Sequence, residues 1–231
     1  LLCGDSTVKS DVSRLVGQES ASVVFTDPPY NALKSWKKDE ARGETRLDPS
    51  QWFENDNMEW DAFEIFLQSV FEQFTAHSVY VCCDYRIYPL VKALLEGVGY
   101  PVKHCIVWKK NMWGLGKRYR FQHEFIVYAC KEDAPFHGDR SQSDVWEEAV
   151  DRETDHNTPK PISIPARAII NSSARGEVIV DYFGAAGSTM VAAQNNGRKA
   201  LLVENAPRYC AVILERMQTA FPDIEIKRID G

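Results

Sequence analysis

The stretch that decides the fold is Ser22-Val23-Val24-Phe25-Thr26-Asp27-Pro28-Pro29-Tyr30. Its first five residues form an apolar run that is typical of a buried parallel strand. Two consecutive prolines cannot continue a strand ladder, so the strand ends there and the backbone stiffens into a loop. Ligands of open α/β sheets bind at the carboxyl ends of strands, where this loop would present an acid and an aromatic ring. A simple turn with a packed tyrosine is the alternative interpretation.

A second strand–turn–helix pattern lies about 150 positions further on and reads Val178-Ile179-Val180-Asp181-Tyr182-Phe183-Gly184-Ala185-Ala186-Gly187-Ser188-Thr189. Such a turn presents backbone N–H groups and a helix N-terminus to a ligand, and its small residues allow close approach. The next strand ends in Glu204, whose carboxylate can accept hydrogen bonds from ribose hydroxyls. The turn lacks the GxGxxG spacing, which argues against a nicotinamide cofactor. A tight turn without a ligand is the alternative.

The rest of the chain alternates strand and helix patterns. This alternation predicts an α/β fold with a doubly wound, mostly parallel, seven-stranded sheet and one antiparallel edge strand. We expect a hairpin of strands 102–109 and 121–130 at that edge, and a terminal edge strand at 224–229. The 231 residues, 44% of them hydrophobic, suit one domain over residues 1–231. Within it we expect a mobile loop at about 31–60 and a small recognition-type insertion at about 131–157.

Charge is unevenly distributed along the chain. The net charge of −6 argues weakly against a nucleic-acid binder. Residues 103–131, however, hold seven Lys or Arg against a single acid, Glu124, while residues 132–155 are strongly acidic. The basic stretch predicts a phosphate footprint, with a solvated strand edge as the alternative. Its candidate DNA-binding residues are Lys109, Lys110, Lys117, Arg118 and Arg120.

The six cysteines have no metal-ligand spacing, so we expect no metal site and free thiols in a reducing cytoplasm. No apolar run approaches the roughly 20 residues that span a bilayer. The chain begins Leu1-Leu2-Cys3 without a methionine, which is typical of a fragment whose native start is missing.

Taken together, Asp-Pro-Pro-Tyr at 27–30 and Asp-x-Phe-Gly-x-x-Gly-Ser-Thr at 181–189 resemble the amino-methylating DNA methyltransferases that use S-adenosylmethionine. In the β group of that family the catalytic tetrapeptide precedes the cofactor motif, as it does here. The segment His156-Asn157-Thr158-Pro159-Lys160-Pro161 is similar to the family's His-Pro-Thr-Gln-Lys-Pro, and Gly4-Asp5, Trp108-Lys109-Lys110-Asn111 and His123-Glu124 are similar to further family elements. The family usually has glycine where Ala185 stands, which would weaken cofactor affinity.

The resemblance implies a Rossmann-like fold and a site-specific, cytoplasmic enzyme of bacterial or phage restriction-modification systems. Asp27, Pro28, Pro29 and Tyr30 would act on the target base. The implied cofactor ligands share the two motifs, the opening element and the segment before the second motif: Asp5, Asp27, Thr158, Lys160, Asp181, Phe183, Gly184, Ala185, Gly187, Ser188, Thr189 and Glu204. Asp5 could instead cap a helix, Lys160 could be an exposed loop residue, Asp181 could only brace the turn, and Phe183 could be core.

The target amine is a poor nucleophile because its lone pair is delocalised into the ring. Asp27 and the Pro28 carbonyl would each accept an N–H, and Tyr30 would stack on a base that has left the duplex. Aspartate at position 27 resembles the adenine-N6 enzymes, whereas cytosine-N4 enzymes more often have serine there. Three alternatives remain: cytosine-N4 transfer, a cofactor- or DNA-binding module without turnover, and RNA or protein methylation. The small recognition segment also favours a homodimer that would enlarge the DNA-contacting surface.

Overall fold

The computed structural model of the chain describes residues 1–32, 56–114, 118–139, 141–150 and 160–229. Across these ranges one sheet runs in the order β1-β8-β7-β2-β3-β5-β4-β6. The strand bounds are β1 Leu2–Cys3, β2 Ala21–Thr26, β3 Ser78–Cys83, β4 Val102–Lys110, β5 His123–Cys130, β6 Val145–Glu148, β7 Val178–Asp181 and β8 Lys199–Glu204. The helix bounds are α1 Lys9–Val16, α3 Trp60–Phe71, α4 Tyr88–Gly97, α5 Ser163–Ser172, α6 Ser188–Asn195 and α7 Pro207–Ala220.

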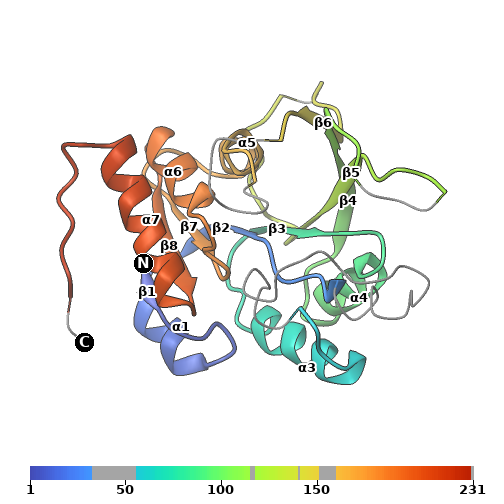
Figure 1. Ribbon diagram of the computed structural model, residues 1–231, viewed down its shortest axis with the longest axis horizontal. Coiled ribbons are helices and arrows are strands. Elements are labelled where there is room, and N and C mark those ends of the chain that lie inside the picture. Colours follow the sequence, from blue (N-terminus) through green and yellow to red (C-terminus); the bar gives the residue numbers. More distant parts are fainter. Residues whose placement is uncertain (33–55, 115–117, 140, 151–159, 230–231) are drawn as a thin grey trace, which may run out of the picture.

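The helices cover both faces of the sheet, which makes a three-layer α/β arrangement (Figure 1). Helices α1, α3 and α4 pack on one face, and α5 and α6 pack on the other. Side chains alternate along each strand, so β2 sends Val24 into the first core and Val23 and Phe25 into the second. All six residues of β2 and of β3 are buried, as expected for central strands with helices on both sides.

The doubly wound, mostly parallel fold predicted from the sequence is confirmed, but the sheet differs in three details. It has eight strands rather than seven. The antiparallel strand is β5, and it lies inside the sheet between β3 and β4 rather than at an edge. The additional strand β6 pairs parallel to β4 beyond it, because Trp146 buries its indole in the second core. Residues 224–229 form no strand.

The expectation of a mobile loop at 31–60 falls mostly outside the described residues, and so does the end of the expected insertion at 131–157. The described part of that insertion contains β6, which an acidic, aperiodic sequence did not indicate. The single-domain organisation stays a prediction. Within the described ranges no helix is long and apolar enough to cross a membrane, and no group of potential metal ligands gathers.

Candidate active site

The two sequence motifs lie at neighbouring strand ends. Strands β2 and β7 pair in parallel, with Val24 opposite Val180, so the residues that follow them emerge from the same edge of the sheet. The side chain of Thr26 donates a 3.0 Å hydrogen bond to Asp181, and the backbone N–H of Tyr182 donates to the Thr26 hydroxyl at 3.2 Å. The Asp-Pro-Pro-Tyr loop and the glycine turn are therefore joined at their bases, although 155 positions separate Thr26 from Asp181.

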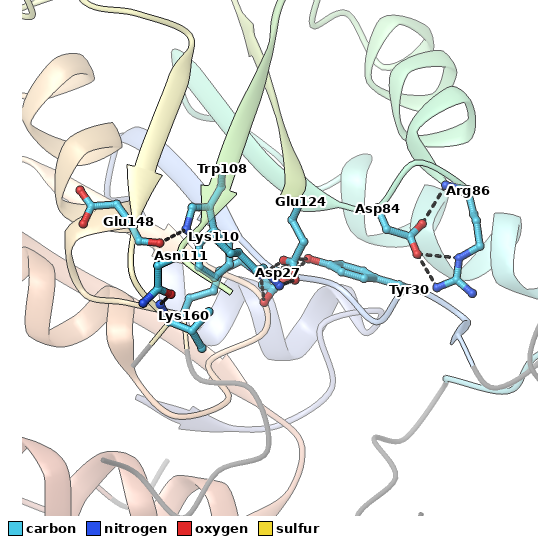
Figure 2. Close-up of polar contacts among 11 residues, drawn as sticks. Asp27, Tyr30, Asp84, Arg86, Trp108, Lys110, Asn111, Glu124, Glu148 and Lys160 are labelled. Carbon is cyan, nitrogen blue, oxygen red and sulfur yellow. Dashed lines mark hydrogen bonds and ion pairs between the residues drawn. The ribbon is translucent and has the colours of Figure 1, made fainter. Parts of the chain in front are cut away.

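Around the tetrapeptide, four charged side chains form one cluster, shown in Figure 2. The Lys160 ammonium donates to Asp27 Oδ2 at 2.6 Å and to Glu124 Oε2 at 3.1 Å. The second carboxylate oxygen of Glu124 accepts from the ammonium of Lys110. The side chain of Lys160 is only 7% exposed, so its charge is balanced by these carboxylates rather than by water.

Protonation in this cluster is set by charge pairing. Burial by itself raises the pKa of Glu124, but Lys160 and Lys110 outweigh burial and lower that pKa to about 2. Burial by itself lowers the pKa of Lys160, and the carboxylates of Asp27 and Glu124 outweigh it and raise the pKa well above its usual value. At neutral pH, Glu124 is therefore a permanent anion and Lys160 a permanent cation.

Tyr30 is tied to the same cluster through its hydroxyl, which Figure 2 shows pointing into it. The hydroxyl donates to Asp27 Oδ1 at 2.7 Å and approaches Glu124 Oε2 at 3.2 Å. Burial and the neighbouring charge of Asp27 raise the pKa of Tyr30 well above its usual value, so the phenol keeps its proton. The ring is thus fixed at the hydroxyl end.

The backbone after Tyr30 is fixed by Asn31, a residue that the sequence argument did not single out. Asn31 is fully buried with a φ of 54°, in the left-handed region that asparagine tolerates better than most residues. Its side-chain amide donates to the Met58 carbonyl at 3.0 Å and its amide oxygen accepts from the Met58 N–H at 2.8 Å. This pair anchors the end of the tetrapeptide against the segment before α3.

The glycine turn is organised around Asp181. Its carboxylate accepts from the hydroxyls of Thr26 and Thr189, the latter at 2.6 Å, and from the N–H of Phe183 at 3.1 Å. These hydrogen bonds favour the ionised form, but burial prevails and raises the pKa of Asp181 to about 7. Asp181 therefore braces the turn, which was the alternative role for it, and Thr189 supports it from the first turn of α6.

The glycine turn is packed closely against α7 and β8. A Cβ on Gly184 would lie 3.1 Å from Ile213 Cδ1 and 3.3 Å from the Val203 carbonyl, and Gly187 has a φ of 74°. Glycine is needed at both positions because the backbone is tightly packed at one and left-handed at the other. Ala185 also has a positive φ, of 42°, which is strained for a residue with a Cβ.

Glu204 lies at the end of β8, next to the glycine turn. Its carboxylate accepts from the backbone N–H of Ala185 at 2.8 Å and of Ala206 at 2.9 Å. A carboxylate is also the kind of group that accepts hydrogen bonds from a ribose diol. The residues present therefore fit a nucleoside cofactor.

Three other predicted cofactor residues, Asp5, Phe183 and Lys160, lie at the same edge with less decisive contacts. Asp5 is exposed and accepts from the backbone and hydroxyl of Thr7, and it does not cap α1, which has no side-chain cap. Phe183 packs against Phe66 with ring centroids 5.9 Å apart. Lys160 is buried against Asp27, so the idea of an exposed loop lysine is wrong. Thr158 lies outside the described residues, and the cofactor contacts of all these residues stay predictions.

The basic stretch differs from a simple phosphate footprint. Lys109 pairs with Glu147 of β6 at 3.0 Å, and Lys110 pairs with Glu124. Both lysines thus have carboxylate partners that the charge count alone did not reveal. Arg118 and Arg120 are exposed, as the prediction requires, and Lys117 lies outside the described residues.

Sequence reasoning gave no site role to Glu124 or Trp108, although both stand in segments that resemble family elements. Glu124 was the single acid in an otherwise basic stretch, and that isolation was the available signal for a buried partner. The Trp108 ring lies close to Lys110 and Lys160, with its centroid 4.7 Å and 5.7 Å from their ammonium nitrogens. Its indole N–H donates to the Glu148 carbonyl at 3.0 Å. Strand β6 therefore contributes to the site by holding Trp108 in place (Figure 2).

Comparison with known proteins agrees with this geometry. The chain matches the N6/N4 family of DNA methylases over residues 21–215. It is 23% identical over 250 residues to the type II methyltransferase M.HinfI of Haemophilus influenzae, across 94% of this chain and 69% of that protein. The type II methyltransferase M2.LlaDCHI of Lactococcus lactis subsp. cremoris is 25% identical over 232 residues, across 86% of this chain and 82% of that protein.

Two solved structures share the fold. The M1.HpyAVI–SAM complex has a TM-score of 0.64 at 19% identity and covers 92% of this chain and 96% of that one. The PvuII DNA methyltransferase, described as cytosine-N4-specific, has a TM-score of 0.70 at 16% identity and covers 97% of this chain and 86% of that one. The family match extends over most of the chain, so the protein belongs to the N6/N4 DNA methylases: it is an amino-group DNA methyltransferase that uses S-adenosylmethionine.

Proposed function

We propose that this methyltransferase acts on the N6 amino group of adenine, in a base that has left the duplex. The proposal depends on the position of the Asp27 carboxylate at the exposed side of the charged cluster. Its side chain is 32% exposed while its partner Lys160 is 7% exposed, so the acceptor faces outward and the counterion lies behind it. An aspartate at this position resembles the adenine enzymes of the family.

Asp27 can accept the target amine without losing its present contacts. An ionised carboxylate offers about four lone-pair directions, and Lys160 and Tyr30 use one on each oxygen. One N–H of the amine would bind Asp27 and the other the Pro28 carbonyl, which turns the nitrogen lone pair toward the methyl donor. Fixed acceptors of this kind stabilise the positive charge that develops on nitrogen.

The bound cofactor supplies a methyl group on a positively charged sulfur. The target nitrogen would gain that methyl group as the neutral thioether leaves, and it would give up one proton to the carboxylate of Asp27. Glu204 would hold the ribose, and the backbone of the 184–187 turn would pass close to the cofactor. Alignment of nitrogen, carbon and sulfur contributes much of the rate, because it replaces an encounter by a fixed geometry.

The buried charges behind Asp27 keep its position fixed. If Lys160 paired with Asp27 alone, it would draw the Asp27 carboxylate inward. In this structure the ammonium charge of Lys160 is shared between Asp27 and Glu124. Tyr30 donates to Asp27 and keeps its own proton, so it orients the carboxylate without competing for the amine proton. We therefore assign Glu124 and Lys160 as positioning residues.

The test is methyl transfer by Asp27→Ala. This variant should lose methylation of DNA by about a thousandfold or more, the order that a lost electrostatic contact reaches in other enzymes. Its affinity for the cofactor should remain close to that of the wild-type protein. Turnover like that of the wild type in Asp27→Ala would end the proposal.

A second candidate is cytosine-N4 transfer, because the PvuII enzyme named for that specificity shares this fold. Mass analysis of nucleosides from treated DNA separates the two: N6-methyladenine supports our proposal and N4-methylcytosine replaces it. Size measurement in solution would test the homodimer that the small recognition segment favours.

A further inference from the structure

Exposed aromatic side chains gather beside the site. Six Phe, Trp or Tyr side chains of the described residues are strongly exposed, and four of them lie on two adjacent segments. They are Tyr85 at 55%, Trp113 at 68%, Tyr119 at 88% and Phe121 at 48%. Aromatic rings left in water forgo the stabilisation of burial, so a concentration of them on one rim indicates a binding surface.

Two of these rings are already stacked on each other. Tyr85 and Phe121 have centroids 5.5 Å apart and an angle of 16° between their planes. Tyr85 follows the last residue of β3 by two positions, and Phe121 precedes the first residue of β5 by two. Because Cys83 pairs with Phe125 in the antiparallel ladder, both rings lie beyond the carboxyl end of β3. This is the edge of the sheet from which Asp27 and Tyr30 also emerge.

Both rings stand on a fixed backbone. The Asp84 carboxylate accepts from the N–H groups of Arg86 at 2.9 Å and Ile87 at 3.3 Å, and it pairs with the Arg86 guanidinium, which holds the turn that carries Tyr85. The carbonyl of Phe121 accepts from the Gly114 N–H at 2.6 Å. The stack is therefore preorganised, and a ligand would bind to it at little cost in conformational entropy.

The charges beside the stack indicate the ligand. Arg118 and Arg120 are exposed on either side of Tyr119, so arginines and aromatic rings alternate directly before Phe121. Basic side chains that follow a backbone, combined with rings on which bases stack, are the pattern by which proteins hold unpaired nucleic acid. A protein partner would fit the rings but would not call for the flanking guanidinium groups.

We propose that Tyr85 and Phe121 form a stacking platform for an unpaired base of the DNA strand, next to the base that Asp27 binds. This inference rests on the proposed function. A base that leaves the duplex removes a stacking partner from its neighbours, at a cost of about a few kcal/mol. The platform replaces part of that lost stacking and so favours the open strand.

The experiment compares two probes of equal length, a short oligothymidylate and an abasic strand with the same phosphates. Binding is measured by fluorescence anisotropy with full-length protein. The wild-type protein should prefer the strand with bases, and Tyr85→Leu and Phe121→Leu should each reduce that preference about tenfold. Affinity for the abasic strand should stay unchanged. Phe136→Leu is the matched control, because Phe136 is also 48% exposed but lies elsewhere, and it should behave like the wild type.

The salt dependence of binding distinguishes the contribution of the aromatic rings from that of the arginines. Arg120→Gln should weaken binding of both probes and reduce the slope of log affinity against log salt by about 1, whereas the leucine variants should leave that slope unchanged. A wild-type protein with no preference for bases, or leucine variants that keep the preference, would overturn the platform. Methylation of DNA by the same wild-type sample is scored separately: methylation without base preference rejects the platform alone, and base preference without methylation rejects the proposed function alone.

Discussion

The two halves of the site hold their carboxylates in opposite ways. Beside the tetrapeptide, Asp27 and Glu124 face the ammonium groups of Lys160 and Lys110. In the glycine turn, Asp181 is held by neutral donors, the hydroxyls of Thr26 and Thr189 and the backbone N–H of Phe183. The pKa values differ accordingly, about 2 for Glu124 and about 7 for Asp181, although both groups are mostly buried.

The partners of each carboxylate follow from what each half of the site requires. Beside the tetrapeptide, the ammonium groups of Lys160 and Lys110 keep the carboxylate of Glu124 ionised against the penalty of burial. A turn that shapes a backbone requires only hydrogen-bond acceptors, and a carboxylate with neutral donors serves that purpose. Four experiments test this contrast between the two halves of the site.

The largest effect on stability should come from Lys160→Met. Removal of Lys160 leaves Asp27 without its ion pair and Glu124 with Lys110 alone, so unfolding in urea should show a loss of about 3 kcal/mol. The control is Lys199→Met, which breaks an exposed pair with Glu19 and should change stability by less than about 1 kcal/mol. Equal effects of the two variants would contradict the idea of a buried charge cluster.

Substitution of Glu124 or Glu204 by glutamine should separate effects on catalysis from effects on cofactor binding. Glu124→Gln should lower kcat by about ten- to a hundredfold and leave the cofactor Kd unchanged, because it disturbs only the positions of Lys160 and Asp27. Glu204→Gln should weaken cofactor binding by about tenfold. Calorimetry gives the Kd and radiolabel transfer gives kcat. The contrast fails if Glu124→Gln changes Kd as much as Glu204→Gln does.

Stability should respond to pH with opposite sign at the two carboxylates. The folded-state pKa of Asp181 is raised to about 7 from 3.8, so between these values the folded protein retains a proton that the unfolded chain has lost, and stability falls as pH rises. The pKa of Glu124 is lowered from 4.5 to about 2, so its contribution is present above 4.5 and is lost as pH falls toward 2.

Urea unfolding between pH 2 and 8 tests this contrast. From pH 4 to pH 7, Asp181→Asn should gain roughly 3 kcal/mol relative to the wild type. The stabilising advantage of the wild type over Glu124→Gln should instead shrink by a similar amount below pH 4.5. Parallel pH profiles for the two variants would show that burial, rather than the kind of partner, determines both pKa values.

The smallest effect should come from Ala185→Gly. The φ of 42° at Ala185 is strained for alanine and easy for glycine, so the substitution should stabilise the protein by about 0.5 to 1 kcal/mol. Ala186→Gly, at a position where φ is not positive, should be neutral or destabilising. Thermal unfolding measures both changes. A loss of stability in Ala185→Gly would mean that the methyl group packs usefully in the turn.

The sequence by itself determined the elements whose cause is local. Consecutive prolines end β2 after Thr26, small residues and glycines shape the turn after β7, and continuous apolar runs define the central strands. The order of these motifs along the chain also indicated the family and its cofactor. Each of these inferences depends on residues close together in sequence, where backbone sterics and burial patterns act directly.

Only the tertiary structure decided which side chains meet. The return of β5 between β3 and β4 brings Glu124 to the tetrapeptide, and Lys160 reaches Asp27 across 133 positions. The same arrangement pairs Lys109 and Lys110 with acids, although composition suggested that they were free to bind phosphate. Lateral strand order is set by the packing of the whole sheet, so a pattern along one segment does not identify which distant charge will face it.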